Sequence, residues 1–195
     1  MKSVGSRRRR RCVGALLATL VWGSSNVHPQ TAKPTDYEVK AAYLANFVKF
    51  IEWPESPSPP PGGVAPADET FAICVLGQDP FGPALDAALA GENLGRRPLI
   101  PRRVANAREA AACRVVFFGE DDRTLRKDLA SLEGTKVLTV SDQPDFLKRG
   151  GMIQFVLQGN PPRVRFEVNL MAAKKAGLNL SSELLKVAAD VRRNP

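Results

Sequence analysis

The chain has 195 residues and a formal net charge of +8, from 28 Lys and Arg residues against 20 Asp and Glu residues. Six of the basic residues, Lys2 and Arg7–Arg11, lie in the first eleven positions, where no acidic residue occurs. Without this segment the balance is 22 basic against 20 acidic residues, or +2, which excludes the basic excess expected of a nucleic-acid-binding protein.

The N-terminal segment has the layout of a secretory signal peptide. The basic residues are followed by an apolar run over 12–22 and by small and polar residues from Gly23. The run is shorter than the roughly 20 residues that a membrane-spanning helix needs. We therefore expect a signal peptide over 1–25, cleaved between Gly23 and Ala32, a flexible tail over 26–35, and export to the periplasm as a soluble protein. A disordered basic tail is the alternative interpretation.

Tyr37 to Glu52 is predicted to form a helix, with Thr35 or Asp36 as its cap. Its aromatic residues recur at helical spacing and form one stripe, which contains Tyr43, Phe47 and Phe50 and continues to Trp53. We interpret this stripe as core, and a surface for dimerisation or docking is the alternative. Pro54 ends the helix, and the proline-rich residues 55–69 are expected to form a surface loop.

From Phe71 onward, apolar strand patterns alternate with helical patterns. The expected strands cover 71–76, 97–104, 114–118, 136–140, 152–157 and 163–170. The expected helices cover 80–90, 105–112, 122–132, 144–148 and 181–192, with Asp79 as the cap of the first and Ser181 as the cap of the last. Short apolar strands separated by helices favour a largely parallel sheet that is covered on both faces.

The last two strands are joined by the turn 159–162, which predicts an antiparallel hairpin at the edge of the sheet. The predicted fold is therefore α/β, with one three-layer α/β/α domain over residues 36–192, a largely parallel sheet and an antiparallel C-terminal hairpin.

Two cysteines lie in the predicted domain, Cys74 and Cys113. An even pair in an oxidising compartment favours a disulfide, and two buried thiols are the alternative. Closing a loop of about 40 residues would stabilise the fold by about 4 kcal/mol in the chain-entropy model.

The predicted domain lacks the side chains of common catalytic sites. The single histidine, His28, precedes it, so neither a nucleophile–histidine pair nor a histidine metal ligand is expected. The acidic run 120–122 is interpreted as solvated acids at a helix start. The turn Gly77–Gly82 lacks the Lys–Ser/Thr ending of a phosphate-binding loop. We expect no enzyme activity, no metal site and no cofactor.

Six segments, taken in order, resemble the family of YfiR-type periplasmic repressors. The segments are 39–54, 73–82, 138–142, 150–153, 164–169 and 177–185. The resemblance extends from about Tyr37 to Val191. Some members carry a second cysteine pair later in the domain, and this chain does not, so a redox role of that pair does not carry over.

The resemblance implies a regulatory binding protein, often dimeric. Such proteins bind the periplasmic sensor region of a membrane diguanylate cyclase, hold the cyclase inactive and lower cyclic-di-GMP. The resemblance also implies that an outer-membrane, peptidoglycan-associated lipoprotein sequesters the repressor, and that cysteine oxidation stabilises it, which fits Cys74 and Cys113. We expect a homodimer and no nucleic-acid partner.

The closing hairpin is the first candidate for the partner-binding surface, because it mixes apolar and charged side chains. The candidate residues are Phe155, Leu157, Arg163, Arg165 and Glu167. Ordinary strand alternation is the alternative explanation of this pattern, and the aromatic first helix is the second candidate surface. The alternative function is a periplasmic small-molecule-binding module that relays a ligand signal to a partner, and an exported hydrolase ranks third.

Overall fold

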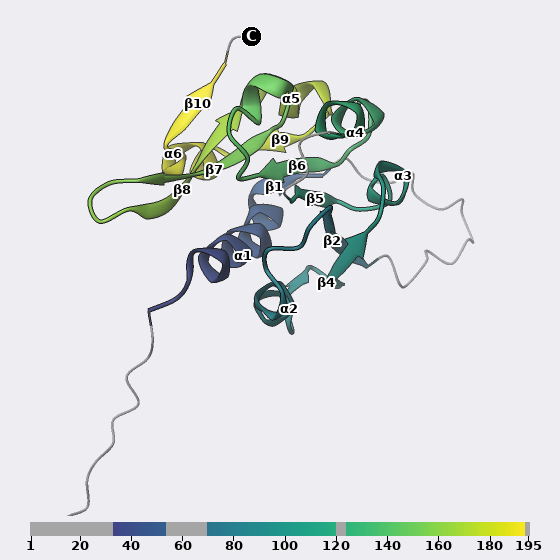
Figure 1. Ribbon diagram of the computed structural model, residues 1–195. Coiled ribbons are helices and arrows are strands. Elements are labelled where there is room, and N and C mark those ends of the chain that lie inside the picture. Colours follow the sequence, from purple (N-terminus) through teal and green to yellow (C-terminus); the bar gives the residue numbers. More distant parts are fainter. Residues whose placement is uncertain (1–32, 54–69, 120–123, 194–195) are drawn as a thin grey trace, which may run out of the picture. The chain divides into compact units, whose positions relative to one another are not determined.

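The computed structural model describes residues 33–53, 70–119 and 124–193 (Figure 1). The predicted signal peptide, most of the predicted tail, the proline-rich loop and the acidic run 120–122 lie outside these residues. No helix in the described ranges is long and apolar enough to span a membrane.

A mainly parallel sheet organises the fold. Its eight strands follow the order β10-β8-β7-β6-β5-β2-β4-β3. Their bounds are β2 Phe71–Leu76, β3 Asn93–Leu94, β4 Arg97–Val104, β5 Val115–Phe118, β6 Leu138–Ser141, β7 Ile153–Gln158, β8 Arg163–Asn169 and β10 Asp190–Arg192. The β7–β8 and β3–β4 pairs are antiparallel, and the other five pairs are parallel. The predicted α/β fold is confirmed.

Helices cover both faces of the sheet. One core includes residues of α1 Asp36–Phe47, α2 Pro83–Leu89, α5 Leu170–Lys175 and α6 Ser182–Val187. The other includes residues of α3 Ala107–Ala110, α4 Leu125–Ser131 and the 3-10 helix η2 Leu147–Arg149. All six residues of β2 are buried, with Ile73 in the first core and Cys74 in the second, as expected for a central parallel strand.

The first helix begins where it was predicted and ends earlier. Thr35 caps α1 in a capping box with Glu38. The helix then tightens into the 3-10 turn η1 Val48–Phe50 and gives way to the short strand β1 Ile51–Glu52, so the prediction of a helix to Glu52 was wrong. The reason is tertiary: β1 pairs with β9 Asn179–Leu180, and the Ser181 N–H donates to the Phe50 carbonyl at 2.8 Å.

The helix after β2 also starts later than predicted. Asp79 does not cap it, because the Asp79 carboxylate accepts the Phe81 N–H (2.8 Å) in a local turn. The chain then passes through Gly82, whose φ of 51° favours glycine, and α2 begins at Pro83.

The C-terminal segment departs most from prediction. Ser181 caps α6 as expected, but the helix ends at Val187 and the predicted continuation to Arg192 was wrong. Residues Asp190–Arg192 instead form β10, which pairs in parallel with β8. The Ala189 N–H also donates to the Phe166 carbonyl (2.7 Å), because the outer edge of β8 offers backbone partners that a surface helix would leave unsatisfied. At the base of the hairpin, the edge of the sheet is therefore β10 and not β8.

A disulfide joins Cys74 in β2 to Cys113, which lies two residues before the start of β5, and the two Cα atoms lie 6.1 Å apart. The predicted disulfide is confirmed. It is possible sterically because β2 and β5 are neighbours in the sheet.

Candidate partner-binding surface

The β7–β8 hairpin extends past the end of β6 and projects from the sheet (Figure 1). β6 pairs with β7 only as far as Ser141 opposite Gln154, whereas β7 and β8 continue to pair as far as Gln158 opposite Arg163. The distal half of the hairpin therefore has no β6 beside it.

An aromatic cluster anchors the hairpin to α1. Phe47 lies 5.9 Å from Phe155 and 5.0 Å from Phe166, measured between ring centroids, and Tyr43 lies 5.5 Å from Phe166. Phe155 and Phe47 are only 2% and 1% exposed. The structure therefore places these two predicted contact residues beneath the surface, where they support the hairpin instead of facing a partner.

The exposed residues of the hairpin lie on two faces. Leu157, opposite Val164, is 55% exposed because it lies at the distal end of the aromatic face. Arg163 and Arg165 are exposed on the opposite face, and Arg165 Nη2 donates to the Val187 carbonyl at 3.1 Å.

Glu167 is half-buried near the base of the hairpin, where it forms an ion pair with Arg192 at 3.6 Å. The five predicted hairpin residues thus separate into a buried anchor, Phe155, three exposed residues and one partly covered acid.

The aromatic stripe of the first helix is divided in the same way. Phe47 is buried, which confirms its interpretation as core, and Tyr43 is half-buried. Phe50 follows α1 in η1 and is 39% exposed. Of the three residues predicted for dimerisation or docking, Phe50 is the exposed one.

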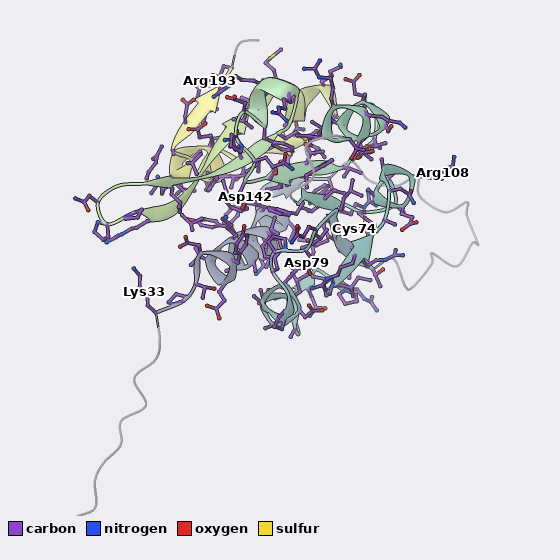
Figure 2. The ribbon with its side chains drawn as sticks, in the orientation of Figure 1. Lys33, Cys74, Asp79, Arg108, Asp142 and Arg193 are labelled. Atoms are coloured by element: carbon purple, nitrogen blue, oxygen red, sulfur yellow. A yellow bond between two sulfur atoms is a disulfide. The ribbon has the colours of Figure 1, made fainter. Side chains whose placement is uncertain are left out.

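A polar group beside the hairpin was missed by the sequence analysis. Asp142, labelled in Figure 2, follows β6 directly. Its Oδ2 accepts from Lys40 Nζ at 2.6 Å and from the Tyr37 hydroxyl at 3.0 Å. The Lys40 and Asp142 side chains are only 10% and 16% exposed. Lys40 lies at helical spacing from Tyr37, and Asp142 comes directly after a strand, but no local signal shows that the two segments meet.

A hollow of about 390 Å³ lies between this polar group and the hairpin. It is lined by Lys40, Asp142, Pro144 and the consecutive residues Gln154–Leu157. It thus combines a satisfied ion pair with the exposed end of β7.

A second ion-pair group lies on the other side of the sheet centre. Arg103, near the end of β4, donates to Asp79 at 2.8 Å and to both oxygens of Asp86 at 3.0 and 2.7 Å. The hydrogen bond from Arg103 lowers the pKa of Asp86, and the same contact raises the pKa of Arg103. These contacts hold the β2–α2 turn against β4, a structural role.

Two close contacts among the described residues lie where a parallel sheet usually forms its ligand crevice. Such a crevice forms at the carboxyl ends of strands whose connections diverge, which in this fold are β2 and β5. Gly119 lies so close to Gln78 that a Cβ on it would clash with the Gln78 carbonyl. Gln143 Nε2 also donates to the Gly119 carbonyl at 2.5 Å.

Another hollow, of about 230 Å³, lies between α4, α5 and the start of β7. Its lining includes an apolar part with Leu129 and Met152 and the cationic side chains of Arg126, Arg149 and Lys175. Glu133 also lines it and forms an ion pair with Lys175 at 3.3 Å. Within the described ranges, no cluster of three or more His, Cys, Asp or Glu residues could hold a metal ion.

Comparison with known proteins places these features in context. A family model described as YfiR/HmsC-like matches residues 37–189. A conserved domain protein from Vibrio cholerae is similar in structure, with a TM-score of 0.52, 10% sequence identity and coverage of 80% of this chain and 60% of that one. An ABC domain from Streptococcus pneumoniae, solved in complex with L-Trp, gives a TM-score of 0.50, 13% identity and coverage of 78% and 60%.

This chain therefore spans about 60% of the length of either solved structure. At such low identity the two structures support the α/β fold alone.

Proposed function

Because the chain belongs to the YfiR/HmsC-like family, we propose that it is a periplasmic regulatory protein that represses a membrane-bound diguanylate cyclase. It binds the periplasmic sensor region of the cyclase, holds the enzyme in its inactive state and lowers cyclic-di-GMP. The family match over residues 37–189 carries this proposal. The role is binding, not catalysis.

Repression of this kind depends on a difference in affinity. The repressor shifts the cyclase toward the inactive state only by the ratio of its affinities for the two states. A rigid surface strengthens binding, because less conformational entropy is lost on association. The disulfide and the aromatic anchor between α1 and the hairpin supply such rigidity.

The exposed part of the hairpin is the proposed contact surface. Leu157 supplies an apolar contact, and Arg163 and Arg165 supply positive charge on the opposite face. Phe155 supports the surface from the core. Apolar contacts combined with charged side chains favour specific association with a partner.

Two further expectations belong to this proposal. The protein forms a homodimer, with Phe50 on the surface of η1 as one exposed apolar contact. An outer-membrane, peptidoglycan-associated lipoprotein releases the cyclase by sequestering the repressor. Light scattering on the purified protein, alone and mixed with that lipoprotein, tests both.

Deletion and complementation test the main proposal. Deleting the gene should raise cellular cyclic-di-GMP, and the wild-type protein should restore the lower level. The purified protein should also capture the periplasmic region of a membrane diguanylate cyclase. Unchanged cyclic-di-GMP together with no captured cyclase region would contradict repression.

The hollow beside α4 and α5 supports the second candidate function, a small-molecule-binding module. Its apolar part and the cationic Arg126 and Arg149 suit a small anion with an apolar body, whereas Lys175 in the same lining is paired with Glu133. Thermal shift measurements with a panel of aliphatic and aromatic carboxylates test this function. A raised melting temperature that is lost in Arg126→Ala would support it, and no shift with any carboxylate would contradict it.

A further inference from the structure

We propose that the free edge of β7, residues Phe155–Gln158, binds an extended segment of the partner cyclase as an additional β-strand. This inference rests on the proposed function and specifies how the partner is recognised. Strand addition at a sheet edge uses backbone hydrogen bonds for affinity and alternate side chains for specificity.

The edge exists because β6 is shorter than β7. β6 ends at Ser141, opposite Gln154, and β7 continues to Gln158 with β8 on its other side only. Among the described residues, no strand pairs with β7 beyond Gln154 on the β6 side. An edge of this kind is a template for pairing with another chain.

The hydrogen-bond pattern shows which backbone groups face outward. The Asn169 N–H donates to the Met152 carbonyl at 2.8 Å, so this opposed pair is a hydrogen-bonded one. Antiparallel pairs alternate between bonded and non-bonded. Gln154 and Val156 therefore bond to β8, whereas the backbone groups of Leu157 point away from β8.

An independent contact supports this pattern. Phe166 is opposite Phe155, and its carbonyl accepts the Ala189 N–H on the side away from β7. In the part of the chain that the structure describes, neither backbone group of Leu157 has a backbone partner.

The hollow of about 390 Å³ runs along this edge. Four consecutive residues of β7, Gln154–Leu157, line it, although successive side chains of a strand point to opposite faces. Asp142 and Pro144, which follow β6, also line it. A strand in this hollow would continue the line of β6 and lie beside β7.

A partner segment can cover the walls of the hollow without leaving a buried charged side chain unpaired. Asp142 already accepts from Lys40 and Tyr37, and Lys40 Nζ lies 4.1 Å from the centre of the Tyr37 ring. An unpaired buried charge would oppose binding, whereas a satisfied pair does not.

The side chains around the edge indicate the composition of the partner segment. Leu157 favours an apolar residue on one face. On the other face, Val156 lies opposite Arg165 of β8, and Arg163 is on the same face of β8. The backbone of β8 would lie about 10 Å from a strand added beside β7, so long side chains of that strand could reach both arginines. We infer an extended segment in which apolar and acidic residues alternate. A second copy of this chain is disfavoured, because it would bring the same arginines to the interface.

Two substitutions at one position test the mode of binding. Leu157→Pro removes the outward N–H and leaves the bonds to β8, whereas Leu157→Ala keeps the N–H and removes the side chain. We expect Leu157→Pro to weaken binding to the periplasmic region of the cyclase by about tenfold or more, and Leu157→Ala to weaken it less. Binding is measured by calorimetry, and circular dichroism and melting curves check the fold of both variants.

The outcomes separate this inference from the proposed function. If the wild-type protein binds no cyclase region, the proposed function fails. If the wild-type protein binds and Leu157→Pro binds equally well, or if both variants lose the same affinity, strand addition alone is overturned.

Amide hydrogen exchange in the wild-type complex provides a measurement that needs no variant. The Leu157 amide should exchange quickly in the free protein and slowly in the complex. Unchanged exchange at Leu157 on binding would overturn strand addition, even if Leu157→Pro failed to fold.

Discussion

Single residues far apart in the chain meet at the end of β6. Lys40 and Asp142 are separated by 102 positions, yet their side chains lie 2.6 Å apart and are only 10% and 16% exposed. A disulfide likewise joins two distant residues, Cys74 in β2 and Cys113 just before the neighbouring strand β5. What such a residue contributes to the stability of the fold depends on whether its polar or reactive side chain is paired.

Asp142→Asn should destabilise the protein by about 2 kcal/mol, because it leaves the partly buried Lys40 ammonium without its counter-charge. Glu133→Gln is the matched control, since the Lys175–Glu133 pair is 73% and 64% exposed and should contribute less than about 1 kcal/mol. Urea unfolding measures both. Equal losses in the two variants would contradict a special role of the Asp142 pair.

Removing the disulfide should lower the free energy of unfolding by about 4 kcal/mol in the chain-entropy model, since it closes a loop of 39 residues. The double variant Cys74→Ser with Cys113→Ser and the reduced wild-type protein should melt at similar, lower temperatures. Added reductant should not affect the double variant. A wild-type melting temperature that is insensitive to reductant would rule out a stabilising bridge.

At the scale of elements, α1 and the hairpin behave as one unit. The helix supplies Tyr43 and Phe47, the hairpin supplies Phe155 and Phe166, and the four rings pack together. A surface strand pair is marginally stable alone, so this packing is what holds the hairpin in place.

Phe47→Ala should cost about 3–5 kcal/mol, because it leaves a cavity between α1 and the hairpin. Phe50→Ala should cost much less, since that ring is 39% exposed. Thermal or urea unfolding separates the two variants. A small loss for Phe47→Ala would show that the aromatic cluster does not anchor the hairpin.

The N-terminus of α1 should carry a pH-dependent contribution to stability. The Thr35 backbone N–H, and secondarily its hydroxyl, hold the pKa of Glu38 below its ordinary value of 4.5. A carboxyl with a lowered pKa stabilises the fold above its unfolded pKa, and this contribution disappears as the pH falls through the folded pKa.

Thr35→Ala should therefore raise the pKa of Glu38 part of the way, because the backbone N–H remains, and the loss of the cap should cost about 1 kcal/mol. An NMR titration of Glu38 measures the pKa, and unfolding at neutral pH measures stability. Ser181→Ala, which removes the cap of α6, should leave the Glu38 pKa unchanged. A Glu38 pKa that stays constant in Thr35→Ala would contradict a role of the hydroxyl.

At the scale of the whole molecule, most strands in the described ranges are paired on both sides, whereas the distal half of the hairpin has no further strand beside either edge. β10 covers the base of β8 from Glu167 to Asn169, which leaves the distal hairpin exposed. The proposed regulator therefore offers its partner a short edge on a scaffold fixed by a disulfide and two cores.

The N-terminal basic residues should be absent from the exported protein. Cleavage between Gly23 and Ala32 removes six basic residues and no acid, so the formal charge falls from +8 to +2. Intact mass and N-terminal sequencing of the protein from a periplasmic extract should show this start. Recovery of the uncleaved chain from the cytoplasm would contradict export and, with it, the proposed function.

Periodicity and local chemistry allowed much of the fold to be predicted. The strands Phe71–Leu76 and Arg97–Val104 have the predicted bounds, and the Thr35 and Ser181 caps were anticipated, because these signals are local. The hairpin was also predicted, but which of its residues are exposed was not. Phe155 and Leu157 follow the same strand pattern. Phe155 is buried because it packs against α1, whereas Leu157 lies nearer the tip of the hairpin and is exposed.

The sequence by itself determined the alternating α/β pattern, the hairpin, the single cysteine pair and the resemblance to YfiR-type repressors, because periodicity, capping and composition depend on near neighbours. Only the tertiary structure decided that Asp190–Arg192 join β8 as a strand, that Ile51–Glu52 leave the first helix, and that Lys40 meets Asp142. These outcomes depend on backbone and side-chain partners that become available only once distant segments have packed together.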